Sequence, residues 1–160
     1  MDNTATRESV KNSPIVKEKR VIISDIAPDT EITFSQEQYL KLQKGLIPKA
    51  MEDKWFIYFE NDSLYFHRSW TGLGIYRAEI IRENVADEDK KYAIKEFYLE
   101  TDEEIYKDGD NKFDLDVLLQ LIFWGLLGID TRERFIEKHG SETSGTMLMW
   151  SIFGRMFFPQ

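Results

Sequence analysis

Short runs of apolar and aromatic residues follow one another between residues 54 and 81, and turn-forming residues separate them. Their sequences are KWFIYFE, SLYFHRSW and GIYRAEII. Aromatic and β-branched residues are enriched in strands, and runs of this length between turn residues are typical of antiparallel hairpins. The pattern therefore predicts a β-meander. Residues 92–100 (YAIKEFYLE) predict a further strand, and residues 20–26 (RVIISDI) bring the expected total to four or five.

The turn between the first two runs determines how they should pair. Asn61 and Asp62 tolerate positive φ better than most residues, so we expect them to form a two-residue hairpin loop. The opposed pairs in this register are Trp55 with Arg68, Phe56 with His67, Ile57 with Phe66, Tyr58 with Tyr65, and Phe59 with Leu64. The face that carries Ile57 is apolar and should lie on the core, whereas Tyr65 and His67 should face the other way.

Apolar residues recur at three- and four-residue spacing in the C-terminal third of the chain, which indicates helices. The first should cover residues 114–128. The second should cover residues 130–138, where Asp130 and Glu133 form a capping-box pattern. A third and strongly apolar helix is expected within residues 142–158.

These elements predict an α+β fold, in which an antiparallel β-meander of four or five strands packs against the C-terminal helices. A shorter amphipathic helix is expected at residues 36–44, with Ser35 as its cap and Gln38 reaching back. Residues 1–20 are polar and lack the apolar stretch of a signal peptide, so we expect a flexible N-terminal tail. Residues 21–160 then form a single α+β domain.

Composition narrows the classes of function. The chain has 160 residues, no cysteine and a net charge of −8. The lack of cysteine excludes disulfides, thiolate metal sites and cysteine nucleophiles. Negative charge disfavours nucleic-acid binding, and the longest apolar runs are shorter than the roughly 20 residues that cross a bilayer. We therefore expect a cytoplasmic protein with no nucleic-acid or membrane partner.

Motifs for cofactors and metals are incomplete. Asp108 and Asp110 have the first two spacings of an EF-hand calcium loop, but Lys112, Phe113 and Leu119 stand where the loop requires oxygen ligands or glycine. Signatures of phosphate-binding loops, zinc proteases and serine hydrolases do not occur in the sequence. The expectation is that no metal or cofactor is bound.

The segment YFHRSWTG (residues 65–72) concentrates side chains suited to recognition. Histidine titrates near neutral pH, and aromatic rings can stack on a flat ligand. The candidate ligand-binding residues are Tyr58, Tyr65, His67, Arg68, Trp70 and Tyr76. The hairpin register divides them between two faces, and the side of Tyr76 depends on whether the WTGLG turn contains a two- or a four-residue loop.

A structural interpretation competes with the ligand surface, and the sequence slightly favours it. If helices cover both faces of the sheet, His67 is a core residue whose polar atoms are satisfied inside the protein. Arg68 is then a cation stacked on Trp55 or Trp70. The exposure of His67 distinguishes the two interpretations.

The string W-F-I-Y, followed closely by L-Y-F-H-R-S-W-T-G, resembles a small bacterial domain without an assigned biochemical function. The matching residues are 55–58 and 64–72, and Ile75 and Tyr76 continue the pattern. The resemblance covers residues 54–81 and leaves the helical remainder unmatched. Such stretches occur alone and beside ADP-ribosylglycohydrolase-like domains. The resemblance therefore implies a link to ADP-ribose or nucleotide biology, but it brings no catalytic residue.

Three hypotheses for function follow. The first is a non-catalytic ligand-binding or regulatory module, whose partner is a nucleotide-like small molecule or a protein. The second is a hydrolase or transferase that uses His67 as a general base. The third is an inhibitor or immunity-type protein that binds a basic partner through its acidic surface. The apolar C-terminal helix could also join two copies of the chain.

Overall fold

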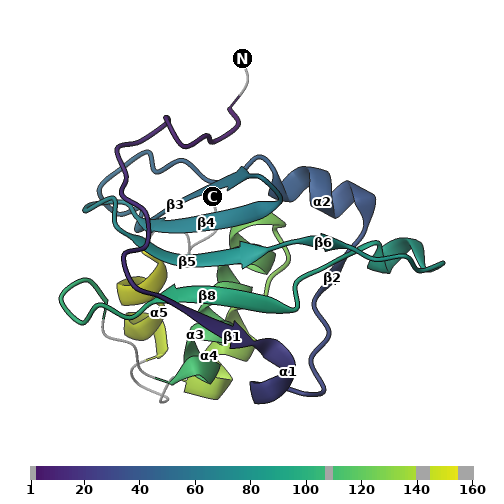
Figure 1. The fold of residues 1–160 in the computed structure, drawn as a ribbon. Helices are drawn as coiled ribbons and strands as arrows, with labels where there is room; N and C mark the ends of the chain where they lie inside the picture. Colours follow the sequence, from purple (N-terminus) through teal and green to yellow (C-terminus); the bar gives the residue numbers. More distant parts are fainter. Residues whose placement is uncertain (1–2, 107–109, 140–144, 155–160) are drawn as a thin grey trace.

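A five-stranded antiparallel sheet with helices on one face forms the centre of the molecule (Figure 1). The structure, a computed structural model, describes residues 3–106, 110–139 and 145–154. The strands come mainly from the first 100 residues, and the longer helices follow them in the chain. This arrangement confirms the predicted α+β fold.

The central hairpin has the predicted register. β3 (Trp55–Glu60) and β4 (Ser63–Arg68) pair antiparallel, and all five expected pairs are present. Asn61 and Asp62 have φ angles of 51° and 62°. Positive φ at both positions matches the twist of a two-residue hairpin loop to that of the flanking strands.

The meander continues beyond this hairpin. β5 (Gly74–Glu79) pairs with β4, β8 (Glu96–Glu100) pairs with β5, and β1 (Glu18–Ile22) pairs with β8 at the edge. The strand order is therefore β1-β8-β5-β4-β3. A register shift near the end of β4 places Tyr76 opposite Phe66, which turns Tyr76 toward the core.

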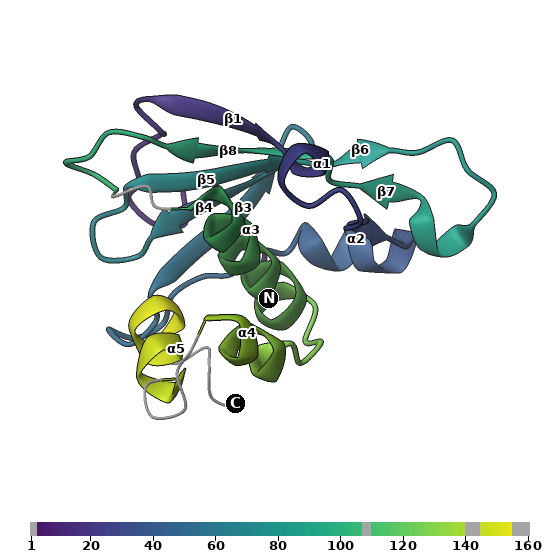
Figure 2. The ribbon, with the colours of Figure 1, turned by 90° about the horizontal axis from the view of Figure 1, so that it is seen from below.

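A second, smaller sheet lies at one end of the first (Figure 2). Its strands are β2 (Thr33–Phe34), β7 (Tyr92–Ala93) and β6 (Ile81–Arg82), and the 3₁₀ turn η1 (Glu88–Lys90) lies between β6 and β7. The strand expected at residues 92–100 is thus divided between β7 and β8. The hairpin formed by β5 and β8 continues into β6 and β7, so one long ribbon contributes to both sheets.

Helices cover one face of the five-stranded sheet (Figure 2). The elements of this layer are α3 (Asn111–Gln120), the π-helical segment η2 (Leu121–Leu126), α4 (Arg132–His139) and α5 (Gly145–Phe153). α5 buries Met149 and Phe153 in the core of its own chain and leaves Trp150 40% exposed. None of the helices that the structure describes combines the length and apolarity needed to cross a membrane.

Two shorter helices precede the hairpin. α1 (Ile23–Ile26) follows β1, and α2 (Gln36–Leu42) follows β2. The predicted cap is present at α2: the Ser35 hydroxyl accepts a hydrogen bond from the Gln38 N–H, and the Gln38 side chain accepts one from the Ser35 N–H. This reciprocal pair satisfies donors that the first turn of a helix leaves without partners.

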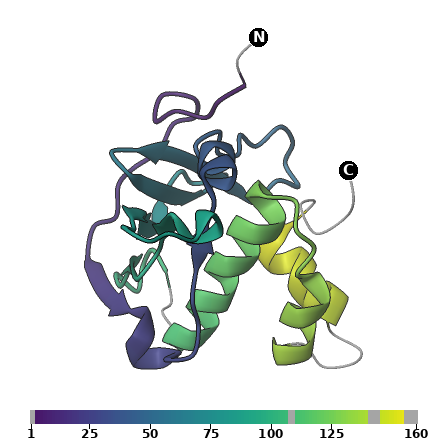
Figure 3. The same cartoon turned by 90° about the vertical axis from the view of Figure 1, so that its right-hand side faces the viewer.

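Residues 3–17, which we call the N-terminal strap, lie across the face of the sheet opposite the helices (Figure 3). The Ala5 N–H donates to the Lys44 carbonyl at 2.8 Å, and Ala5 is only 1% exposed. The sequence predicted a flexible tail that ends at residue 20, but that boundary falls within β1. The polar side chains of these residues suggested a tail. The strap is nevertheless held against the sheet, because its backbone N–H and C=O groups hydrogen bond to neighbouring segments.

A buried carboxylate anchors the end of the strap. The Glu100 side chain accepts hydrogen bonds from the N–H groups of Val16 (2.6 Å), Lys17 (2.9 Å), Thr101 (3.1 Å) and Asp102 (3.0 Å). Burial acts to raise the pKa of Glu100, but these donors together outweigh it and lower the pKa below its ordinary value. The carboxylate therefore stays ionised at neutral pH and holds the strap through charge-assisted hydrogen bonds.

A buried tyrosine joins the sheet to the helical layer. Tyr76 is 1% exposed, and its hydroxyl donates to Asp114 Oδ1 on α3 at 2.8 Å. The Tyr106 hydroxyl lies 2.8 Å from the Tyr76 hydroxyl and donates to the same carboxylate oxygen. Burial, and then the neighbouring Tyr106 and Asp114, raise the pKa of Tyr76 well above its ordinary value. Tyr76 is consequently a neutral donor to a buried carboxylate.

The change Tyr76→Phe removes this donor and keeps the ring. We expect the free energy of unfolding to fall by roughly 1–3 kcal/mol, because a buried carboxylate loses a hydrogen-bond partner. The matched control is Tyr98→Phe, since the Tyr98 hydroxyl donates to Glu96 at the sheet surface; its effect should be within about 0.5 kcal/mol. Urea denaturation measures both. Equal losses in the two variants would contradict the proposed importance of the Tyr76–Asp114 bond.

Candidate functional site

The six candidate residues do not form one site. Tyr58, Tyr65 and His67 lie on the strap side of the sheet, as the register predicted. Arg68 and Tyr76 lie on the helix side, and Trp70 belongs to the turn between β4 and β5. The sheet itself separates the first group from the second.

His67 is sealed inside the protein. It is 2% exposed, its Nδ1 lies 3.0 Å from the Gly72 carbonyl, and its ring stacks on Tyr58 with centroids 5.5 Å apart. Because a carbonyl only accepts hydrogen bonds, Nδ1 must carry the proton. Burial lowers the pKa of His67, although the bond to Gly72 acts in the opposite direction. His67 is therefore a neutral core histidine, as the structural interpretation predicted.

The cover over His67 differs from the predicted one. Among the described residues, the helices cover the opposite face of the sheet, and the N-terminal strap covers this face (Figure 3). The Ser13 N–H donates to the Gly72 carbonyl at 2.8 Å. Gly72 has a φ of 75°, and a Cβ at this position would collide with the carbonyl of Lys11 in the strap. The turn after β4 thus needs glycine both for its backbone conformation and for close contact with the strap.

The tyrosines beside His67 are only partly available. Tyr58 is 4% exposed and stacks on the half-buried Tyr65, with centroids 4.9 Å apart. Burial, followed by the nearby Glu60, raises the pKa of Tyr58 to about 12. A shallow groove lined by Tyr58 and Tyr65 remains beside the strap, but Arg7 in its wall is already paired with Glu60 at 3.8 Å. The groove has a volume of about 750 Å³, and apart from the two tyrosines and Glu60 its lining residues belong to the strap.

On the helix side, Arg68 and Tyr76 flank Trp55. The Arg68 guanidinium lies 5.1 Å from the centre of the Trp55 ring, and Trp55 stacks on Tyr76 with centroids 5.8 Å apart. The Trp55 indole N–H donates to the Ile152 carbonyl at 2.8 Å. The predicted stacking of Arg68 is therefore confirmed, and its partner is Trp55.

Trp70 stands apart from both groups. It is 67% exposed, and its indole N–H donates to the Met51 carbonyl at 2.6 Å. The Lys54 ammonium lies 5.2 Å from the centre of its ring. Trp70 thus presents an apolar ring to solvent while its polar atom is satisfied within the protein.

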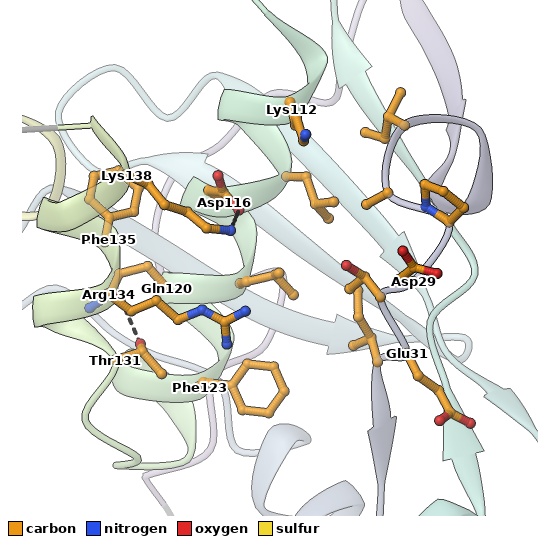
Figure 4. A pocket seen from close by; sticks show the side chains of 17 residues that line it. Asp29, Glu31, Lys112, Asp116, Gln120, Phe123, Thr131, Arg134, Phe135 and Lys138 are labelled. Carbon is orange, nitrogen blue, oxygen red and sulfur yellow. Dashed lines mark hydrogen bonds and ion pairs between the residues drawn. The ribbon is translucent and has the colours of Figure 1, made fainter.

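A cavity on the helix side, which the sequence did not indicate, is a further candidate site. It has a volume of about 520 Å³ and lies between the connection 26–32, α3, η2 and α4 (Figure 4). We call it the helix-side cavity. Its apolar lining residues include Ile26, Ile32, Leu115, Leu119 and Phe123. Its charged lining residues are Asp29, Glu31, Lys112, Asp116, Arg134 and Lys138.

Stacked rings and a buried amide stiffen the wall of this cavity. The Phe123 ring stacks on Phe34 of β2 with centroids 5.7 Å apart. Gln120 is 2% exposed, and its side-chain oxygen accepts a hydrogen bond from the Thr131 hydroxyl at 2.6 Å. The Gln120 side-chain nitrogen has no hydrogen-bond partner among the described residues. The wall therefore includes a buried donor of the kind that water or a ligand often satisfies.

An ion-pair cluster holds α4 against α3 at the edge of the cavity. Asp116 on α3 lies 2.7 Å from His139 Nε2 and 3.4 Å from Lys138 Nζ. The His139 ring packs between Phe113 and Phe135, with centroids 4.9 Å from each. His139 is the last residue of α4, so its contact with Asp116 joins the C-terminal end of that helix to α3.

The lining residues were missed because they come from separate parts of the chain. Residues 26–32 have the character of an ordinary loop, and Lys112, Arg134 and Lys138 look like the solvated faces of two helices. Arg134 and Lys138 are four residues apart and so share one face of α4. That spacing was the one local signal, and it is common on exposed helices. For metals, the described residues contain no group of three or more His, Cys, Asp or Glu side chains that could hold an ion.

The buried His67 generates a prediction about its protonation. We expect nitrogen-15 NMR of the full chain to show the Nδ1-protonated neutral form and a titration midpoint below the ordinary value of 6.5. Because the unfolded chain takes up this proton more readily, the contribution of His67 to stability is present above pH 6.5 and is lost as the pH falls. A midpoint above 6.5, or a neutral form protonated at Nε2, would show that His67 is open to solvent or differently bonded.

Comparison with protein families, curated proteins and solved structures finds no match to this chain. The resemblance of residues 54–81 to a small bacterial domain therefore stays a prediction. It also concerns the hairpin, whereas the helix-side cavity is built largely from residues outside that stretch. The functional conclusion must consequently come from the geometry of the site.

Proposed function

We propose that this protein is a non-catalytic binding module that holds a small molecule in the helix-side cavity. The observation that carries the proposal is the cavity of about 520 Å³, with its apolar floor and charged rim. Small-molecule sites in proteins have volumes of about 300–1,000 Å³ and combine an apolar lining with a few oriented polar groups. The helix-side cavity fits both criteria.

The chemistry of the lining supports binding rather than catalysis. The hydroxyl groups that line the cavity belong to Thr30 and Thr131, and the Thr131 hydroxyl already donates to Gln120. A nucleophilic hydroxyl needs a base within hydrogen-bond reach, but the described lining residues include no histidine, and the Glu31 and Asp116 carboxylates are engaged in ion pairs. The hydrolase hypothesis relied on His67, which lies on the opposite side of the sheet beneath the strap. It gains no support from this geometry.

The nature of the ligand remains part of the proposal. The sequence resemblance suggests ADP-ribose or another nucleotide, and the Phe123 ring beside cationic side chains is a suitable setting for a base and a phosphate. ADP-ribose and adenosine monophosphate are therefore the first ligands to test. A regulatory role would follow if binding changed the contacts between the connection 26–32 and the helices.

Filling the cavity provides the test. In Leu119→Trp, a larger side chain occupies a half-buried lining position, and we expect it to abolish binding of ADP-ribose and of fragment hits mapped to the cavity by NMR. The matched control is Leu40→Trp, because Leu40 is 54% exposed on α2 and does not line the cavity; this variant should bind as the unmodified protein does. Ligands that bind both variants equally, or hits that map to other surfaces, would contradict the proposal.

A further inference from the structure

We infer that the ligand of the helix-side cavity is an anion, with a phosphate or carboxylate attached to a flat apolar body. This inference rests on the proposed function and specifies the class of ligand. It depends on which charged groups of the cavity are already neutralised inside the protein and which are not.

Several charges in the lining have partners. Asp116 is paired with Lys138 and His139, as described above. Glu31 is paired with Lys90, with a nitrogen–oxygen distance of 3.0 Å. These groups need no ligand charge to balance them.

Two cationic side chains and one anionic side chain of the lining have no such partner among the described residues. Arg134, Lys112 and Asp29 line the cavity, and none of them forms an ion pair with another described residue. Among the charged lining residues that have no ion-pair partner, cations therefore outnumber anions by two to one, in a chain whose net charge is −8. An excess of this sign, opposite to that of the whole molecule, favours an anionic ligand over a cationic or neutral one.

The position of Arg134 is suited to such a ligand. Figure 4 shows its side chain extending from α4 into the space between the helices and the connection 26–32. A guanidinium presents paired N–H donors that match the oxygens of phosphate or carboxylate. Lys138 lies one turn away on the same face of α4, and Lys112 lies on α3. Cations from two helices thus border the same space.

The apolar lining of the cavity indicates that the ligand also has an apolar part. Leu115, Leu119 and Phe123 line the cavity beside these cations, and the Phe123 ring is held by its stacking on Phe34. A free inorganic anion would leave this apolar surface uncovered. A ligand with an aromatic ring would cover it, and the ring could stack or pack edge-on against Phe123.

The experiment uses small probes that separate charge from shape. Phenyl phosphate and benzoate carry both features, benzyl alcohol carries the ring alone, benzylamine reverses the charge, and inorganic phosphate lacks the ring. Each is titrated into the nitrogen-15-labelled full chain. We expect phenyl phosphate or benzoate to bind most tightly, with shifts confined to residues 26–32, α3 and α4. Comparison of these two probes shows which anion is preferred.

The matched variants are Arg134→Gln and Arg82→Gln. Both remove one exposed arginine charge, but Arg82 lies on β6 and does not line the cavity. We expect Arg134→Gln to weaken phenyl phosphate binding about tenfold or more, the equivalent of one charge-assisted contact, and Arg82→Gln to change it less than about twofold.

The outcomes separate the two proposals. If benzyl alcohol or benzylamine binds in the cavity at least as well as the anions, the protein is a binding module but its ligand is not an anion. If Arg82→Gln weakens binding as much as Arg134→Gln, the attraction is a general charge effect and the assignment to Arg134 is wrong. If no probe and no fragment binds in the cavity, the proposed function itself is overturned.

Discussion

The hydrogen bond between Tyr76 and Asp114 is the interaction on which the arrangement of the two layers depends. It joins the middle of β5 to the first turns of α3, and both groups are almost fully buried. A buried carboxylate is costly unless donors surround it, so α3 is stable against the sheet only in positions that keep Asp114 near the tyrosine hydroxyls. The residues that follow Asp114 on α3, including Leu115, Asp116 and Leu119, form one wall of the helix-side cavity. The position of the cavity wall is therefore coupled to a bond that lies outside the cavity.

The opposite face of the sheet is completed in a different way. Aromatic side chains there are covered by a strap that has few apolar residues and is attached mainly through backbone hydrogen bonds. Glu100 adds a charge-assisted attachment, because its buried carboxylate accepts the backbone N–H groups of Val16 and Lys17 at the end of the strap. The two faces thus differ: side-chain packing and one buried polar cluster hold the helices, whereas backbone bonding holds the strap.

Local signals account for what the sequence could predict. The Asn61-Asp62 turn determined the hairpin register, and the Ser35 cap located the start of α2. The strap and the cavity could not be predicted in the same way. Backbone hydrogen bonds leave no mark on side-chain composition, so residues 3–17 looked like a tail. The cavity brings residues 26–32 next to residues 112–138, and such long-range contacts have no signature in a single sequence.

The candidate site illustrates the same limit on what can be predicted from a single sequence. The YFHRSWTG segment attracted attention because its residues are chemically versatile, yet the register and the strap use most of them for packing. His67 and Tyr58 are buried, and Arg68 stacks on Trp55. The cations of the cavity look unremarkable in sequence because exposed arginines and lysines are common on helices. Their significance arises from the apolar floor that the fold places beside them.

The most direct test of this account is a crystal structure of the full chain with phenyl phosphate. We expect the phosphate to lie about 2.7–2.9 Å from the guanidinium nitrogens of Arg134, with the ring over Leu119 and Phe123. Phenyl phosphate bound elsewhere on the protein, or a cavity filled by its own side chains and closed to the probe, would contradict it.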